Sequence, residues 1–240
     1  MQEYNQENGR KRMIKGYIFD YGGTLDTGGD HWGKVLWRSY SKNDVPISEE
    51  DFRMAYVYGE RTLAANRIIQ PTSTFHDTLS KKIQLQMDYL RENCDLQETE
   101  DNHARVLADV YSYAKNNTEH SAEVLKTISK RYPLVLVSNF YGNINAVLHE
   151  FGFDGLFKYV VESAVVGIRK PDPRIFTLGV EHLGISACET MVVGDSYDKD
   201  ILPAAKAGCK TTWIKGEGWT EDEVAAPIAD RIINDLSELL

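Results

Sequence analysis

The pattern of apolar and polar residues predicts a set of short buried strands. Each strand candidate is a brief apolar run bounded by glycine or polar residues. The runs lie at residues 17–19, 134–137, 159–161, 191–194, 211–214 and 232–233. From residue 121 onward they alternate with segments of helical periodicity, which ends at Gly152 and Gly208 in two cases. This alternation predicts an α/β fold with a doubly wound parallel sheet.

The block that follows the first strand has no strand pattern of its own. Leu79, Ile83, Met87 and Leu90 recur at helical spacing and predict a buried stripe on a helix over about 75–92. Other helices are predicted from His31, from Ser48 toward Asn66 with Asp51 completing a capping-box-like start, and from about Val106 to Asn116. A separate helix is predicted over 122–130.

These patterns predict two structural units and a tail. We expect residues 13–27 and 117–240 to form the α/β core domain, and residues 28–116 to form an inserted, all-helical cap domain over one end of the sheet. Residues 1–12 are polar and without periodicity, so we expect a flexible N-terminal tail.

Composition narrows the class of protein without naming an activity. A formal net charge of −9 argues against nucleic-acid binding, which relies on a basic face. No apolar run is long enough to span a bilayer and the first residues do not resemble a signal peptide, so we expect a cytoplasmic protein without membrane contact. The three widely spaced cysteines predict reduced, structural thiols. The sequence leaves the oligomeric state open.

Chemically active residue types follow several of the predicted strands. Asp20 ends the first strand and is followed by two glycines, Gly22 and Gly23. A charge at the end of an apolar strand needs a partner, a metal or a chemical role. Ser138 with Asn139, Lys170, and Asp195 with Asp200 follow later strands. Because the carboxyl ends of parallel strands lie at one edge of the sheet, we expect these side chains to converge there.

The residue types at this edge suit phosphate chemistry. A carboxylate can act as a nucleophile and form an aspartyl-phosphate. Further carboxylates hold Mg²⁺, which prefers oxygen ligands. A lysine, a hydroxyl and backbone N–H groups can neutralise and orient the phosphoryl oxygens.

In their order along the chain, these segments resemble the four motifs of the haloacid dehalogenase (HAD) superfamily. Residues 20–25 resemble its first motif, Asp-x-Asp-Gly-Thr, with Gly22 in place of the second aspartate. Residues 138–139 resemble the second motif, residues 170–173 the third, and residues 194–200 the fourth. The resemblance covers nearly the whole chain from Gly16 and implies the phosphatase branch with a helical (C1-type) cap.

The resemblance also implies a role for each position. Asp20 would be the nucleophile and a Mg²⁺ ligand, and the Gly22 carbonyl and Asp195 would be further ligands. Asp200 would hold a metal-bound water or orient Lys170. Substrate-binding positions would be Gly23, Ser138, Asn139 and Lys170, with Ser138 and Lys170 on the transferring group of a small phosphorylated substrate.

Gly22 removes the side chain that, in the family's phosphatases, protonates the leaving oxygen and then activates water. General acid–base catalysis of this kind typically raises the reaction rate by about 10²–10⁴-fold. Three alternatives follow. The substrate has a good leaving group, as an acyl phosphate does, or a cap residue supplies the acid, with His31, His76 and Glu60 as candidates. In the third alternative, the chain is a weak or inactive phosphatase that binds a phosphorylated ligand. The family's dehalogenases also lack this aspartate, but they lack the acidic fourth motif as well, so Asp195 and Asp200 argue against dehalogenation.

Overall fold

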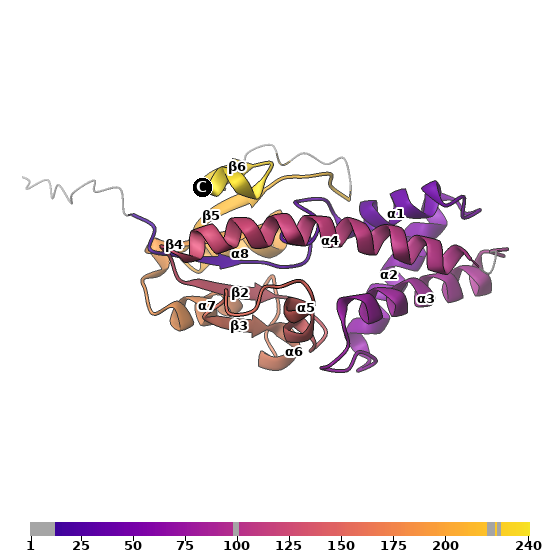
Figure 1. Cartoon of the computed structure of the whole chain (residues 1–240), viewed down its shortest axis with the longest axis horizontal. Coiled ribbons are helices and arrows are strands. Elements are labelled where there is room, and N and C mark those ends of the chain that lie inside the picture. Colours follow the sequence, from indigo (N-terminus) through magenta and orange to yellow (C-terminus); the bar gives the residue numbers. More distant parts are fainter. Residues whose placement is uncertain (1–12, 98–100, 220–223, 225–226) are drawn as a thin grey trace, which may run out of the picture.

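The sheet is parallel throughout and carries the first strand near its centre. The computed structural model describes residues 13–97, 101–219, 224 and 227–240. Within these residues the strand order is β3-β2-β1-β4-β5-β6 (Figure 1). The strands are β1 (Gly16–Phe19), β2 (Leu134–Ser138), β3 (Tyr159–Glu162), β4 (Thr190–Gly194), β5 (Lys210–Ile214) and β6 (Arg231–Ile233). The predicted α/β doubly wound parallel sheet is confirmed.

Both faces of the sheet are covered by helices, which explains why the strands read as continuous apolar runs. Phe19 packs on one face in a cluster with α4 (Asn102–Ser129) and α5 (Ile144–Glu150). Ile18, the next residue toward the N-terminus, packs on the other face with α7 (Arg174–Leu183) and α8 (Leu202–Lys206). Successive strand residues point to opposite faces, so β1, β2 and β4 each contribute buried residues to both clusters.

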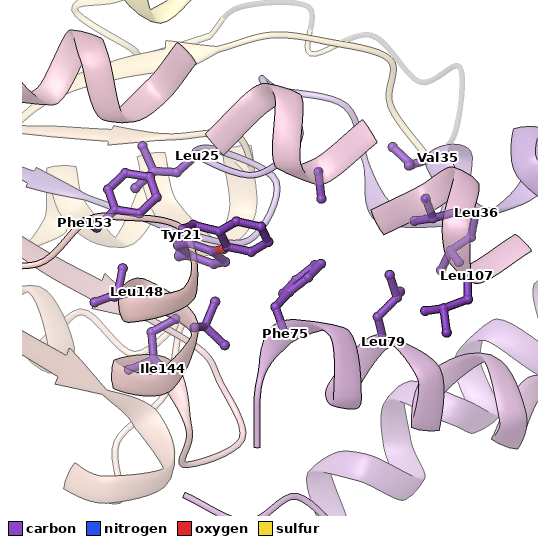
Figure 2. Close-up of a cluster of buried hydrophobic side chains, with 14 of the residues drawn as sticks. Tyr21, Leu25, Val35, Leu36, Phe75, Leu79, Leu107, Ile144, Leu148 and Phe153 are labelled. Atoms are coloured by element: carbon purple, nitrogen blue, oxygen red, sulfur yellow. The ribbon is translucent and has the colours of Figure 1, made fainter. Parts of the chain in front are cut away.

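Helices α1 (Trp32–Lys42), α2 (Glu49–Ala65) and α3 (Phe75–Asn93) form the predicted all-helical cap, together with the first turns of α4. They lie beyond the carboxyl ends of the strands (Figure 1). Ser48 caps α2 by accepting the Asp51 N–H, and Thr74 forms a full capping box with Asp77 on α3. Buried apolar side chains run from the sheet face into the cap without interruption (Figure 2).

The helix α4 differs from the prediction. The sequence pattern suggested one helix ending near Asn116 and another over 122–130, but α4 is a single helix from Asn102 to Ser129 that passes from the cap onto the sheet. It contains no glycine or proline, and its buried residues keep helical spacing from Val106 to Ile128. The predicted boundary at 116/117 therefore falls inside a helix.

Smaller differences occur near the C-terminus. The helix expected over 201–207 is α8, preceded by a π-helical turn, η2 (Tyr197–Ile201), that includes Asp200. The closing helix is the 3₁₀ turn η3 (Leu236–Leu239), and α6 (Ser163–Val166) and the 3₁₀ turn η1 (Ala187–Glu189) were not predicted. The predicted tail 1–12 and part of the loop 215–222 lie outside the described residues. No helix in the described part of the chain is long and apolar enough to cross a membrane.

Candidate active site

Asp20 stands at the centre of the edge formed by the carboxyl ends of the strands. Phe19 pairs in register with Leu136 on β2 and with Val193 on β4. The Asp20 N–H donates to the Val193 carbonyl at 3.0 Å, which continues the strand pairing by one residue. The residues that end β2 and follow β4 therefore lie level with Asp20, as the sequence predicts for parallel strands.

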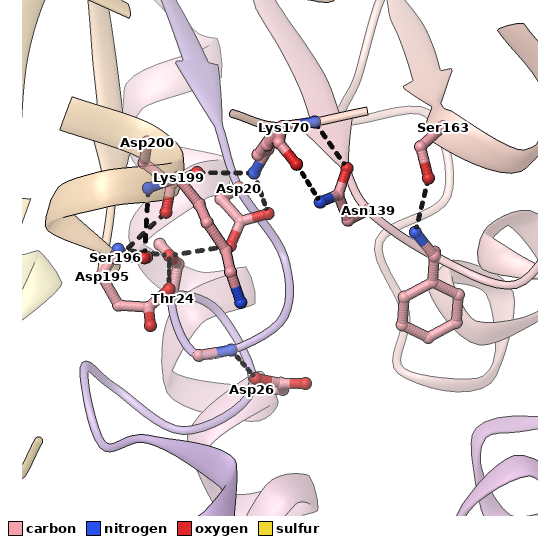
Figure 3. A network of polar contacts seen from close by, with 12 residues as sticks. Asp20, Thr24, Asp26, Asn139, Ser163, Lys170, Asp195, Ser196, Lys199 and Asp200 are labelled. Carbon is pink, nitrogen blue, oxygen red and sulfur yellow. Dashed lines mark hydrogen bonds and ion pairs between the residues drawn. The ribbon is translucent and has the colours of Figure 1, made fainter. Parts of the chain in front are cut away.

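Lys170 joins two of the predicted carboxylates. Its Nζ lies 2.5 Å from Asp20 Oδ1 and 2.6 Å from Asp200 Oδ1, with all three side chains buried (Figure 3). Burial alone would lower the pKa of Lys170, but the charges of Asp20 and Asp200 outweigh this effect and raise it. Lys170 is therefore a charged ammonium held in position by two carboxylates.

Asn139 fixes the backbone of Lys170. Its Nδ2 donates to the Lys170 carbonyl at 3.1 Å, and its Oδ1 accepts the Lys170 N–H at 2.9 Å. Both ends of the amide are thus engaged with the lysine main chain. Asn139 therefore positions the backbone of Lys170, and Asn139 also lines the cavity between the strand ends and the cap.

Three carboxylates face this single ammonium. Asp20, Asp195 and Asp200 each offer an oxygen, and these oxygens all lie within 4.8 Å of one another. Burial and the charges of Asp200 and Asp20 raise the pKa of Asp195 well above its ordinary value, and burial raises the pKa of Asp200 to about 6. The cluster therefore gathers more negative charge than Lys170 balances, and a divalent cation with oxygen ligands fits this donor set.

Thr24 links the two sides of the cluster, a contact the sequence did not predict. Its Oγ1 lies 3.0 Å from Asp195 Oδ1 and 3.4 Å from Asp20 Oδ2, and it accepts the Asp195 N–H at 3.0 Å. Asp200 uses both oxygens within the protein, because Oδ2 accepts the Ser196 N–H at 3.0 Å. This arrangement favours Asp200 as the residue that orients Lys170, one of its two predicted roles.

Ser138 is buried at the end of β2 with its hydroxyl unused. Its side chain is 1% exposed, and Oγ has no hydrogen-bond partner within the described residues. Buried hydroxyl groups are usually paired, so an unpaired one beside a cavity suits an absent oxygen-rich group. Ser138 lines the same cavity as Asp20 and Lys170.

The cavity has a volume of about 1100 Å³ and lies between the strand ends and the cap. From the core it is lined by the predicted residues Asp20, Gly22, Gly23, Ser138, Asn139, Lys170, Asp195 and Asp200. From the cap it is lined by residues of α1, α2 and α3, and by His31, which directly precedes α1. A cavity of this size exceeds what a phosphoryl group alone would fill.

The structure does not favour any of the three predicted replacement acids, for a reason of position at His76 and of protonation state at His31 and Glu60. His76 is exposed on α3 and does not line the cavity. Burial lowers the pKa of His31 to about 4, so its ring is neutral, and Nδ1 accepts the Gly33 N–H. Glu60 pairs with Lys82 at 2.6 Å and accepts from Tyr141, and these contacts hold its pKa low despite burial.

Asp26 is a further buried carboxyl at this cavity. Its Oδ1 accepts the Gly23 N–H at 2.7 Å, and its oxygens lie 3.1 and 3.2 Å from Trp32 Nε1. Burial raises the pKa of Asp26 to about 7. Sequence reasoning missed this residue, because an aspartate after the Gly-Gly-Thr turn is typical of a solvated loop.

A family model of a haloacid dehalogenase-like hydrolase matches residues 14–208 of the chain. The chain belongs to this family. Among similar curated proteins, phosphoserine phosphatase of Thermus thermophilus is 37% identical over 83 residues, which are 35% of this chain and 32% of that protein. Glyceraldehyde 3-phosphate phosphatase of Methanocaldococcus jannaschii is 37% identical over 93 residues, 39% of this chain and 40% of that one. The chain thus spans about two fifths or less of the length of these two relatives.

The fold is shared with a protein of known structure. A crystal structure of a dehalogenase aligns with a TM-score of 0.62 over 94% of this chain and 95% of that one. Its identity of 21% shows a common fold and leaves the activity open. Function therefore has to be inferred from the site, with its three carboxylates and one lysine.

Proposed function

We propose that this HAD-like hydrolase is a Mg²⁺-dependent phosphatase of a small phosphorylated metabolite, with Asp20 as the nucleophile. The observation that carries the proposal is the set of three carboxylate oxygens within 4.8 Å of one another, against one ammonium. Such an excess of negative charge suits a site that takes up a divalent cation. Both relatives named above are phosphatases by name, which supports the same reaction class.

Asp20, Asp195 and the Gly22 carbonyl would hold the Mg²⁺, with Asp200 behind Lys170. When bound, Mg²⁺ would supply positive charge against the phosphoryl oxygens. The ammonium of Lys170 and the free Ser138 hydroxyl would hold the same oxygens. An Asp20 oxygen then attacks phosphorus while the bond to the leaving oxygen breaks, and water hydrolyses the resulting aspartyl-phosphate to release phosphate and restore Asp20.

The leaving oxygen receives no proton from position 22. A β-carbon built on Gly22 has no atom within 4 Å, so close contacts do not explain the absence of a side chain at this position. Substrates whose leaving group is stable as an anion, such as acyl phosphates, would depend least on this missing acid. We therefore expect activity to rise with the acidity of the leaving group.

The open space at Gly22 also favours a second candidate, a phospho-ligand-binding protein with little or no turnover. Mg²⁺-dependent phosphate release from phosphomonoesters and acyl phosphates separates the two. We expect Asp20→Asn to abolish release, Gly22→Asp to raise it about tenfold or more on esters with poor leaving groups, and Asp198→Asn, an exposed neighbour of the site, to leave it unchanged.

Two outcomes would contradict the phosphatase proposal. Phosphate release by Gly22→Asp but not by the native protein would mean that the native chain is a binding protein with a phosphatase fold. Chloride release from 2-chloropropionate without Mg²⁺, in the absence of any phosphate release, would point to dehalogenation instead.

A further inference from the structure

Among the residues that the structure describes, every exposed charged residue that lines the cavity is positive. Four residues that line the cavity are both charged and exposed, and all four are cations: Arg61, Arg67, Arg169 and Lys199. The acidic lining residues are buried or half-buried and lie deeper: Asp20, Asp26, Glu60, Asp195 and Asp200. These four exposed lining residues are all positive although the protein as a whole carries a net charge of −9.

These four side chains, called the rim cations below, have no acidic partner in the part of the chain that the structure describes. None of them forms an ion pair there. Some exposed cations elsewhere on the described chain have an acidic partner, such as Arg38 with Asp30 and Arg174 with Asp172, and others, such as Arg131, do not. Unpaired like charges repel one another, and a bound anion would relieve that repulsion.

The rim cations come from both sides of the cavity. Arg61 lies on α2 and Arg67 follows that helix, whereas Arg169 directly precedes the site lysine and Lys199 lies on η2. Figure 3 shows the Lys199 side chain extending from its helical turn toward the loop that follows β1. An anion held at the rim would therefore contact the cap and the core together.

The buried cap cation does not compete for this role. Lys82 is 9% exposed, pairs with Glu60 at 2.6 Å, and lies over the rings of Trp32 and Tyr141. Its charge is already balanced inside the cap. An anionic group of the substrate other than the phosphate that is cleaved would therefore meet unpaired positive charge at the rim cations.

We propose that the rim cations form a second anion-binding site, and that the substrate is an organic phosphate whose leaving group carries a second phosphate. Arginine suits this ligand because its planar guanidinium can donate two hydrogen bonds to one phosphate. The cavity of about 1100 Å³ has room for a sugar-sized body between the two phosphates. The inference rests on the proposed phosphatase function.

Glucose 6-phosphate, 6-phosphogluconate and glucose 1,6-bisphosphate test the inference, because they share a 6-phosphate and differ in the charge at the other end. We expect kcat/KM for the bisphosphate to exceed that for glucose 6-phosphate about tenfold or more, the effect of one good charge-assisted contact. High salt should reduce this ratio. Equal values for the two substrates, or a preference for the carboxylate of 6-phosphogluconate, would overturn the inference.

The double variant Arg61→Gln/Arg67→Gln identifies the residues responsible. It should lower the bisphosphate preference about threefold or more while kcat/KM for glucose 6-phosphate stays within about twofold. Arg131→Gln is the matched control, because Arg131 is exposed and has no ion-pair partner in the described ranges but lies at the amino end of β2, away from the cavity. An unchanged preference in the double variant would also overturn the inference.

Calorimetric titration of Asp20→Asn with the same ligands separates this inference from the proposed function. Tighter binding of the bisphosphate, with no phosphate release from any ester by the native protein, would support the rim site and reject the phosphatase. Phosphate release that depends on Asp20, with equal binding of all three ligands, would support the phosphatase and reject the rim site.

Discussion

Gly23 lies directly against the carboxylate of Asp195. A β-carbon at Gly23 would lie 2.3 Å from Asp195 Oδ2, and the backbone there is left-handed with φ of 98°. The preceding Gly22 has nothing within 4 Å of the corresponding position. The two adjacent glycines thus differ. Position 23 needs a glycine because the Asp195 carboxylate leaves no room for a side chain, whereas position 22 has room for one.

This contrast predicts unequal effects of alanine. Gly23→Ala should lower the free energy of unfolding by about 2–4 kcal/mol, because it combines overpacking with a strained backbone. Gly22→Ala should change it by less than about 0.5 kcal/mol. Urea denaturation of the two variants beside the native protein measures the difference, and equal losses would contradict the assignment.

Metal binding should stabilise the protein through Asp195. At a Mg²⁺ concentration 100 times the Kd, the gain is about 2.7 kcal/mol, which corresponds to a rise in Tm of about 5–10 °C for a chain of this size. In Asp195→Asn this rise should be lost. Because burial and the nearby charges of Asp200 and Asp20 raise the pKa of Asp195, the variant should also unfold at a higher temperature than the native protein when both are metal-free.

Differential scanning calorimetry with EDTA and with Mg²⁺ provides the measurement. Asp198→Asn is the control, because it removes an exposed carboxylate from the same segment and should keep the full response to Mg²⁺. An Asp195→Asn protein that Mg²⁺ still stabilises as strongly as the native chain would place the metal elsewhere.

Asp26 predicts a specific dependence of stability on pH. Its pKa is raised from the ordinary value of 3.8 to about 7, so the folded protein binds this proton more tightly than the unfolded chain does. The resulting stability is present in full below pH 4 and is lost as pH rises through 7, a loss of about 4 kcal/mol. Asp26→Asn removes the titration and keeps an oxygen that can accept from Gly23 and Trp32.

Metal-free denaturation curves between pH 4 and 8 provide the comparison. The native protein should lose stability relative to Asp26→Asn as pH rises, with most of the change between pH 4 and 7. Parallel curves for the two proteins would show that Asp26 is ionised throughout this range.

The ion pair between Lys82 and Glu60 should show strong coupling. Lys82→Met leaves the Glu60 carboxylate beside Tyr141 without its cation, so this variant should lose more stability than the double variant Lys82→Met/Glu60→Gln. A double-mutant cycle in urea at pH 7 should give a coupling energy above about 1 kcal/mol. Additive effects of the two substitutions would mean that the contact contributes nothing in solution.

The core of the site could be predicted because strand ends are visible in a single sequence. Asp20, Ser138 and Asp195 each follow an apolar run, and parallel strands necessarily bring such ends to one edge. Lys170 was also predicted, although the two carboxylates that bind it come from positions 150 residues before it and 30 residues after it. Lys170 was predicted from the order of the four motifs along the chain, because residue spacing alone does not indicate that it meets these carboxylates.

The cap could be predicted as helical, but its contribution to the cavity could not. Lys82 and Glu60 lie on different helices, and nothing in the periodicity of either indicates that they meet. His31 and His76 looked alike in sequence, yet only His31 lines the cavity. Which polar side chain of a helix faces a cavity depends on tertiary packing, which a sequence pattern does not contain.

The unbroken helix α4 limits how the cap can move. At about 42 Å in length, it extends from the cap across the sheet as one lever without a glycine or proline that would act as a hinge. We therefore expect a swing of the cap to tilt the end of α4 that packs on the sheet through Leu125 and Ile128. Entry of substrate to Asp20 would then depend on packing at that end of the helix, and Ile128→Ala should alter the rate of opening without touching the site.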